Sequence, residues 1–223
     1  MAKCKTQRYT LLDDFYFGSM CVLVDELNRF NIPYAIVGGA AYQIKMAGIL
    51  SKDVKGDISS VQGLEGILRG TGDIDLTIKS DMGRMVNLLN QMAASCKHIN
   101  IETQPSKSVR FKKGNDSVYV NYQTEPADVK ALTEHYDKII ETAEEVYLRK
   151  GNKDFYFKIP SMPYLIVSKV LRREEKDKVD IFNLLGLCRK KNIKLNFEEV
   201  RSILKSIGKE DSFDYIKKIF YDL

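Results

Sequence analysis

Two aspartates one residue apart, Asp73 and Asp75, stand in the segment DIDLTI at 73–78. The segment alternates between polar and aliphatic residues, which predicts a strand with Asp73, Asp75 and Thr77 on one face and the three aliphatic residues in the core. Carboxylates roughly 7 Å apart along a strand repel each other, and a divalent cation such as Mg²⁺ or Mn²⁺ removes that cost. The alternative for an isolated Asp-x-Asp is a pair of solvated strand residues.

A glycine pair, Gly38-Gly39, follows the apolar segment YAIV (34–37) and precedes AAYQIKM, a good helix start. Glycines between a strand and a helix let several backbone N–H groups converge on an anion, and the helix N-terminus adds its dipole. A tight turn without a ligand would also use glycine. Together, a phosphate cradle and a carboxylate pair predict metal-assisted transfer from a nucleoside triphosphate.

The elements that must position these residues follow from the hydrophobic pattern. We expect a helix capped by Thr10 that ends near 31–33, a helix capped by Asp81 and a helix over much of 126–143. Residues 48–72 contain six glycines and predict a long loop, partly helical near 64–68. The expected strands are 34–37, 73–78, 98–103, 108–113 and 117–123, with a turn at 114–115, and a hairpin over 145–160 that turns at 151–152.

After Ser161 the pattern is helical, with expected helices from 161, over 176–190, over 197–207 with Asn196 and Glu199 as a capping box, and over 212–221. The sequence therefore predicts an α+β fold, with a mixed sheet flanked by helices in residues 1–160 and a helical domain in residues 161–223. Basic residues are concentrated in the helical part, with 14 Lys/Arg against 10 Asp/Glu after position 160. Such a charge suits phosphate-bearing partners, or simply a solvated lysine-rich surface.

Composition narrows the class of protein. The chain has 223 residues, a formal net charge of +5 and 44% hydrophobic residues, enough for a substantial core. No apolar run approaches the ~18 residues that span a bilayer, and the N-terminal residues do not resemble a signal peptide. The cysteines lie far apart (Cys4, Cys21, Cys96, Cys188) and only two histidines occur (His98, His135), which favours reduced thiols, a cytoplasmic location and no zinc site.

The segments IVGGAAYQIKMAG and RGTGDIDLTI resemble the signature of the nucleotidyltransferase (DNA polymerase beta-like) superfamily. More narrowly, they are similar to its prokaryotic abortive-infection toxin-like (AbiEii-like) branch, whose blocks read Gly-Gly-x-Ala and Arg-x-Thr-x-Asp-hydrophobic-Asp. Arg69 and Thr71 match the second block together with both aspartates. A later helix of that branch matches SMPYLIVSKVLRREEKDKVDIFNLL, which contains Lys169, Asp177 and Asp180. The resemblance covers about residues 34–186.

The resemblance implies a role for each matched residue. Gly38, Gly39, Arg69, Thr71 and Lys169 would bind the nucleotide. Asp73 and Asp75 would bind the metal and take part in catalysis. Lys169 could instead be a surface helix lysine, and the carboxylates of Asp177 and Asp180 could pair with Arg173 or Lys176, which would make them organisers of the site.

One expected residue differs from the superfamily pattern. A later strand should carry a third carboxylate, which assists the metal and accepts the proton of the attacking hydroxyl. In SVYVNYQ that place is taken by Asn121, on the face shared by Tyr119 and Gln123. An amide oxygen can ligate a metal but cannot act as a base. Glu102 or Asp116 could substitute for it.

Two hypotheses of different class follow. The first is a magnesium-dependent nucleotidyltransferase that moves a nucleotidyl group from a nucleoside triphosphate to a hydroxyl. The resemblance suggests RNA (the tRNA acceptor end) or a protein side chain as acceptor, with the chain as toxin of a toxin–antitoxin pair and a cognate antitoxin as partner; an aminoglycoside-type small acceptor is the enzymatic alternative. The basic runs RKGNK (149–153) and RKKNIK (189–194) would suit RNA phosphates. The second is a catalytically weak nucleotide- or partner-binding module.

Overall fold

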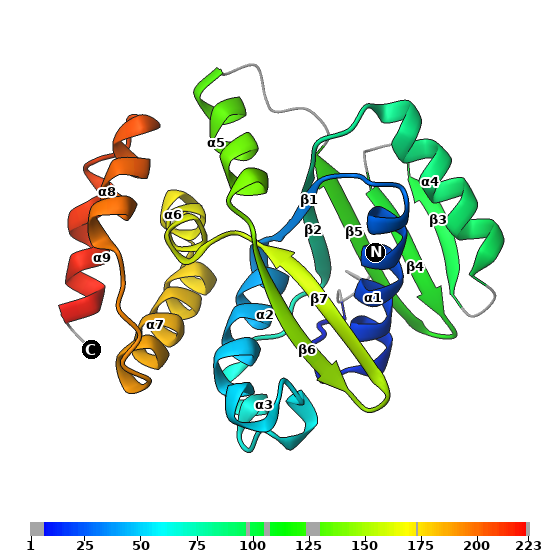
Figure 1. Ribbon diagram of the computed structural model, residues 1–223, viewed down its shortest axis with the longest axis horizontal. Helices are drawn as coiled ribbons and strands as arrows, with labels where there is room; N and C mark the ends of the chain where they lie inside the picture. The colour runs from blue at the N-terminus through cyan, green and yellow to red at the C-terminus, as the bar shows by residue number, and fades with distance from the viewer. Residues whose placement is uncertain (1–6, 97–98, 105–107, 124–129, 173, 222–223) are drawn as a thin grey trace, which may run out of the picture.

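The computed structural model describes residues 7–96, 99–104, 108–123, 130–172 and 174–221 (Figure 1). Its centre is a five-stranded mixed sheet with the strand order β1-β2-β5-β4-β3. Only β2 and β5 run parallel, and the other neighbours are antiparallel. The strands are β1 (Tyr34–Val37), β2 (Asp73–Ile78), β3 (Asn100–Gln104), β4 (Ser108–Lys113) and β5 (Asp116–Gln123).

Helices α1 (Asp14–Arg29) and α4 (Met82–Ser95) contact each other and cover the sheet, with α4 against β3 (Figure 1). Helix α2 (Gly38–Leu50) packs against β1 and β2 and also contacts the C-terminal helices. It is apolar on all sides because it is surrounded, and most of its residues are buried. Helix α2 is therefore the element that joins the sheet to the rest of the molecule.

A separate hairpin of β6 (Glu144–Lys150) and β7 (Lys153–Ile159) packs against β1 and α2. It turns at Gly151, whose φ of 59° lies in the left-handed region that favours glycine. The hairpin and its turn were predicted from the sequence and are confirmed.

The C-terminal part is helical, with α6 (Met162–Arg172), α7 (Glu175–Lys190), α8 (Phe197–Ser206) and α9 (Ser212–Tyr221); α5 (Lys130–Glu141) precedes the hairpin. Helices α6 to α9 share an apolar cluster that also contains Ala35 of β1. Leu165, Leu184 and Cys188 belong instead to the main core around the sheet. Helices α6 and α7 therefore pack onto the α+β part through both clusters, and the buried apolar residues of α8 and α9 belong to the second cluster.

The predicted α+β architecture is confirmed, including the buried aliphatic residues of β2 and the two faces of β5. The helix cap predicted at Thr10 is wrong. Asp13 is the N-cap of α1, and its carboxylate accepts a hydrogen bond of 2.6 Å from the backbone N–H of Thr10. At Asn196 the cap is confirmed, because its side chain accepts from the backbone N–H of Glu199.

The segment predicted as a loop over 48–72 is more ordered than its glycines indicated. Helix α2 continues to Leu50, and two 3₁₀ turns, η1 (Lys52–Val54) and η2 (Ile58–Ser60), and the short α3 (Leu64–Ile67) follow. Ile58 and Leu64 are fully buried and fix these turns to the core. Predictions at Cys4, His98 and 126–129 lie outside the described residues.

Two absences apply to the described part of the chain. No helix in it is long and apolar enough to cross a membrane. Its three cysteines, Cys21, Cys96 and Cys188, are free thiols. Burial raises the pKa of Cys21 to about 12 and that of Cys188 to about 11, so both stay protonated at neutral pH.

Candidate active site

Asp73 and Asp75 lie at the start of β2, between β1 and β5. Both carboxylates are partly exposed, while Ile74 between them is fully buried. In the sheet register Asp75 faces Val37 of β1 on one side and Asn121 of β5 on the other. The end of β1, the start of β2 and the middle of β5 therefore meet at these two carboxylates.

Neighbouring polar groups fix the orientation of both aspartates. The Thr71 hydroxyl donates to Asp73 Oδ1 at 2.8 Å, and the Asn121 side-chain amide donates to Asp75 Oδ1 at 3.0 Å. Below them the hydroxyl of Tyr16 donates to the backbone carbonyl of Asp73 at 3.0 Å. Burial raises the pKa of Tyr16 well above its usual value, and the nearby charges of Asp73 and Asp75 add to this. Tyr16 is therefore a permanent neutral donor under the site.

The glycine pair lies directly against these carboxylates. Gly38 begins α2 with a φ of +67°, and a Cβ on it would stand 2.5 Å from Asp75 Oδ2. A Cβ on Gly39 would stand 3.1 Å from the Thr71 hydroxyl. Only glycine gives both this backbone conformation and this approach at position 38. The positive end of the α2 dipole is thus placed beside the two aspartates, with no acidic residue in the first turn of the helix.

Arg69 links this region to the C-terminal helices. Its guanidinium makes a bidentate pair with Asp180 of α7, with Nε–Oδ1 at 2.9 Å and Nη2–Oδ2 at 2.8 Å. The Nη2 atom also lies 3.6 Å from the Cβ position of Gly39. The hydrogen bond to Asp180 raises the pKa of Arg69. Burial by itself would raise the pKa of Asp180, but the hydrogen bonds and charges of Arg69 and Lys169 outweigh it and lower that pKa.

Lys169 of α6 is fully buried behind this pair. Its ammonium contacts Asp177 at 2.8 Å and Asp180 at 2.6 Å, and it lies 5.0 Å from the centre of the Tyr42 ring. The side chain is only 1% exposed. In this arrangement Lys169 reaches the glycine loop through Asp180 and Arg69, so its predicted contact with phosphate remains a prediction.

The structure separates the two alternative carboxylates from the site. Glu102 lies on β3, three strands from β2, which is roughly 14 Å at the usual strand spacing, and it pairs with Lys112 at 2.8 Å. Asp116 is five residues before Asn121 on β5, roughly 17 Å along the strand, and accepts from Gln7 at 3.0 Å. Asn121 is therefore the β5 residue beside Asp75, as the alternation in SVYVNYQ predicted.

Sequence reasoning did not select Tyr119 or Arg110, which lie in one row with Asp73. Tyr119 is the register partner of Asp73 and Arg110 is the register partner of Tyr119, so the three residues form a row across β2, β5 and β4. Tyr119 is 36% exposed, and the Arg110 guanidinium lies 5.4 Å from the centre of its ring. An exposed aromatic ring beside two carboxylates offers a flat surface for a substrate ring. The period-2 pattern already placed Tyr119 on the face of Asn121.

Gln43 was also missed, although a glutamine in the mostly apolar AAYQIKM segment is a visible signal. Its side chain is 1% exposed. It accepts from the backbone N–H of Leu11 at 2.8 Å and donates to the carbonyls of Tyr9 and Arg69 at 3.2 and 3.1 Å. Gln43 thus holds the segment just before β2, which contains Arg69 and Thr71, in place.

The donor atoms fit a hard cation better than a zinc ion. Asp73 and Asp75 present carboxylate oxygens on one face, while the Asn121 amide N–H donates to Asp75; the described residues contain no group of three or more His, Cys, Asp or Glu side chains that could hold a metal. Mg²⁺ retains several waters and commonly uses only one or two protein carboxylates. The site therefore fits a magnesium ion that is shared with a ligand.

Comparisons with known proteins find similarity among solved structures. No protein-family model matches the chain, and a search of curated proteins finds no match. Among solved structures, the chain is similar to the solution structure of the antibiotic-resistance factor ANT(2'')-Ia. The two share 14% sequence identity with a TM-score of 0.41, over 95% of this chain and 94% of the other.

Proposed function

We propose that this protein is a nucleotidyltransferase of the DNA polymerase beta-like fold, which moves a nucleotidyl group from a nucleoside triphosphate to a hydroxyl acceptor. The observation that supports this most is the contact between the first turn of α2 and β2. There the backbone of Gly38 approaches Asp75 so closely that a Cβ would stand 2.5 Å from its carboxylate. An anion-binding helix N-terminus and a carboxylate pair are thereby combined at one point.

Each residue has a separate task in this proposal. The backbone around Gly38 and Gly39 and the dipole of α2 bind the triphosphate. Arg69, which Asp180 holds beside Gly39, contributes positive charge to the same side. Thr71 and Asn121 hold the carboxylates of Asp73 and Asp75 in place before the substrate arrives, which is the preorganisation that electrostatic catalysis requires.

Asp73 and Asp75 would hold magnesium or manganese. When bound, the metal would supply charge neutralisation at the transferring phosphorus and a template for the phosphate oxygens. The oxygen-only donor set and the partly exposed carboxylates support this assignment.

The acceptor proton has no carboxylate base on β5. Asn121 has only an amide there, and Glu102 and Asp116 lie far from Asp75. We propose that the proton leaves to water or to a group of the acceptor. General-base assistance is worth about 10² to 10⁴ in rate, so we expect slow transfer with a simple alcohol.

For the acceptor we propose RNA, in particular the tRNA acceptor end, or a protein side chain, with the chain acting as the toxin of a toxin–antitoxin pair. The basic runs RKGNK (149–153) and RKKNIK (189–194) support it, because their positive charges suit RNA phosphates. A test is expression of the chain with and without the adjacent reading frame. Growth arrest that the neighbour relieves, and that Asp73→Asn removes, is expected; no arrest would contradict the toxin assignment.

Calorimetry tests the nucleotide site directly. The wild type should bind a non-hydrolysable triphosphate only with Mg²⁺ or Mn²⁺, and Asp73→Asn with Asp75→Asn should abolish this binding. Glu102→Gln is the matched control, because it neutralises a carboxylate on the same sheet far from the site and should leave the affinity unchanged. Equal affinity in the double variant and the wild type would contradict the proposal.

A nucleotide-binding module without transfer is the second candidate. It is favoured by Asn121, whose amide occupies the place of a base and donates to Asp75. Such a module would bind the triphosphate as above but would release no pyrophosphate with any acceptor. Release of pyrophosphate in the presence of RNA, lost in Asp75→Asn, would reject this candidate.

A further inference from the structure

A second concave site lies at the other end of α2, and neither the sequence motifs nor the proposed reaction uses it. It is a cavity of about 500 Å³, a size typical of small-molecule sites. Gly48 on its wall is nine residues after Gly39, roughly 14 Å along the helix at about 1.5 Å per residue. The cavity is therefore separate from the pair of aspartates, and a small ligand in it cannot reach them.

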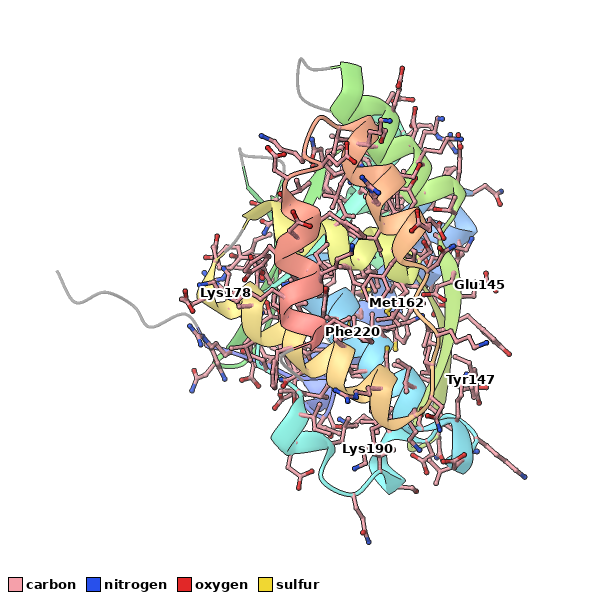
Figure 2. All side chains as sticks on the ribbon, turned by 90° about the vertical axis from the view of Figure 1, so that its left-hand side faces the viewer. Glu145, Tyr147, Met162, Lys178, Lys190 and Phe220 are labelled. Carbon is pink, nitrogen blue, oxygen red and sulfur yellow. The ribbon has the colours of Figure 1, made fainter. Side chains whose placement is uncertain are left out.

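The cavity walls come from both parts of the molecule. Helix α2, the segment after it and strand β6 form one side, and Met162 of α6 and Ile193 after α7 form the other. Figure 2 shows Met162 in the middle of the molecule, with Glu145 and Tyr147 of β6 along the neighbouring edge. Cavities at such junctions between packed parts are frequent ligand sites.

Two glycines make the walls possible. A Cβ on Gly48 would stand 2.5 Å from Val146 Cγ1, and one on Gly56 would stand 2.6 Å from the Tyr147 ring. Gly56 also has a φ of +80°, and its carbonyl accepts from the backbone N–H of Arg149 at 2.8 Å. The glycine-rich segment after α2 is thus fixed to the edge of β6.

The lining combines an apolar floor with a few polar groups. Ile49, Val146, Met162 and Ile193 supply apolar surface, and Tyr147 supplies an aromatic ring. The hydroxyl of Ser51, whose side chain is fully buried, has no hydrogen-bond partner among the described residues.

Charge at the cavity favours an anion. Lys45 is neutralised by Glu144, with which it forms an ion pair. Lys52 and Lys55 are exposed at the rim and have no ion-pair partner among the described residues. Glu145 also lines the cavity and is opposite Lys158 in the β6–β7 register. The lining therefore carries three lysines against two glutamates, a net positive charge.

We propose that this cavity is a second ligand site, which binds a small amphipathic anion: an apolar or aromatic body on the floor and a carboxylate, sulfonate or phosphate at Lys52 and Lys55. A pair of naphthalene probes tests this. 8-Anilino-1-naphthalenesulfonate combines such a body with an anion, and N-phenyl-1-naphthylamine is the same ring system without the sulfonate. Fluorescence titration of the full chain should show that the sulfonate probe binds at a single site, and more tightly than the neutral probe.

Lys52→Gln with Lys55→Gln should weaken the sulfonate about five-fold to ten-fold and change the neutral probe less than about two-fold. Lys52→Arg with Lys55→Arg should restore the affinity. The matched control is Lys178→Gln with Lys218→Gln, at a second apolar hollow that Val179, Phe182 and Tyr215 line between α7 and α9. The proposal would be overturned if the control variant lost sulfonate binding while Lys52→Gln with Lys55→Gln kept it. An equal sulfonate affinity in all variants would also overturn it.

Discussion

Asn121→Asp is the substitution that most sharply examines how the site is built. The amide of Asn121 donates to Asp75 Oδ1 at 3.0 Å, so the variant replaces a hydrogen bond with two facing carboxylates. At this 3.0 Å separation two charges repel by about 1.4 kcal/mol at a dielectric constant of ~80 and by about 5.5 kcal/mol at ~20. We therefore expect the metal-free variant to lose about 2 to 4 kcal/mol of unfolding free energy at pH 7.

The same repulsion should increase the affinity of the variant for the metal. A divalent cation between the carboxylates removes it, so Mg²⁺ should recover most of the lost stability and bind the variant more tightly than the wild type. Repulsion raises the pKa of the introduced pair in the folded state above its unfolded value. The destabilisation is therefore present at pH 7 and disappears as the pH falls below the unfolded pKa, near 4.

Urea unfolding with and without Mg²⁺, at pH 7 and at pH 4, measures these quantities. The control is Gln123→Glu, which adds the same charge to β5 on the same face but opposite Thr77. If Asn121→Asp lost the same stability with and without Mg²⁺, the argument that position 121 lies beside a metal site at Asp75 would be refuted. A variant that is stabilised by Mg²⁺ but transfers no faster would instead limit the role of position 121 to metal binding.

Four further predictions follow from the structure. Gly38→Ala should lower the unfolding free energy by about 1 to 3 kcal/mol and abolish triphosphate binding, because φ is positive and the Cβ would meet Asp75, as calorimetry and urea unfolding can measure. Lys169→Met should destabilise by about 3 to 5 kcal/mol, since it leaves two buried carboxylates without their ammonium; a loss of triphosphate affinity with unchanged stability would contradict this. The lowered pKa of Asp180 contributes stability above its unfolded pKa that is lost as the pH falls through the folded value, so a stability profile from pH 6 to pH 3 should flatten in Asp180→Asn. Ser51→Ala should leave the melting temperature unchanged or raise it, because it removes a buried hydroxyl without a partner; a clear decrease would show that the hydroxyl is bonded.

The strand residues of the site could be predicted from sequence because a strand has a period of two. Alternation alone placed Asp73 and Asp75 on one face of β2 and Asn121 on the polar face of β5. The register that puts Asn121 directly opposite Asp75 could not be predicted, because it depends on how β2 and β5 pair across more than 40 intervening residues.

The arrangement of the buried charges could not be predicted from the sequence. A helical spacing suggested pairs within α7, yet Asp180 pairs with Arg69, which lies 111 residues away, and with Lys169 on the preceding helix. Such pairs form because the packing of α6 and α7 against α2 encloses four charged side chains, Arg69, Lys169, Asp177 and Asp180, whose two positive and two negative charges neutralise one another. Local sequence contains no information about this enclosure.

The segment 48–72 was predicted only in part: the helix expected near 64–68 is α3, whereas the packing of the rest was not predicted, for a related reason. Its glycines indicated a loop, but Gly48 and Gly56 allow close packing against β6, and Ile58 and Leu64 are buried in the core. Tertiary contacts override the low helix propensity of glycine here.

A crystal structure with Mn²⁺ and a non-hydrolysable nucleoside triphosphate would test the central claim most directly. The account predicts an anomalous manganese peak between Asp73 and Asp75, with the phosphates against the backbone of Gly38 and Gly39 and Arg69 beside them. Manganese bound elsewhere, or a triphosphate that leaves the first turn of α2 untouched while the metal is present, would contradict it.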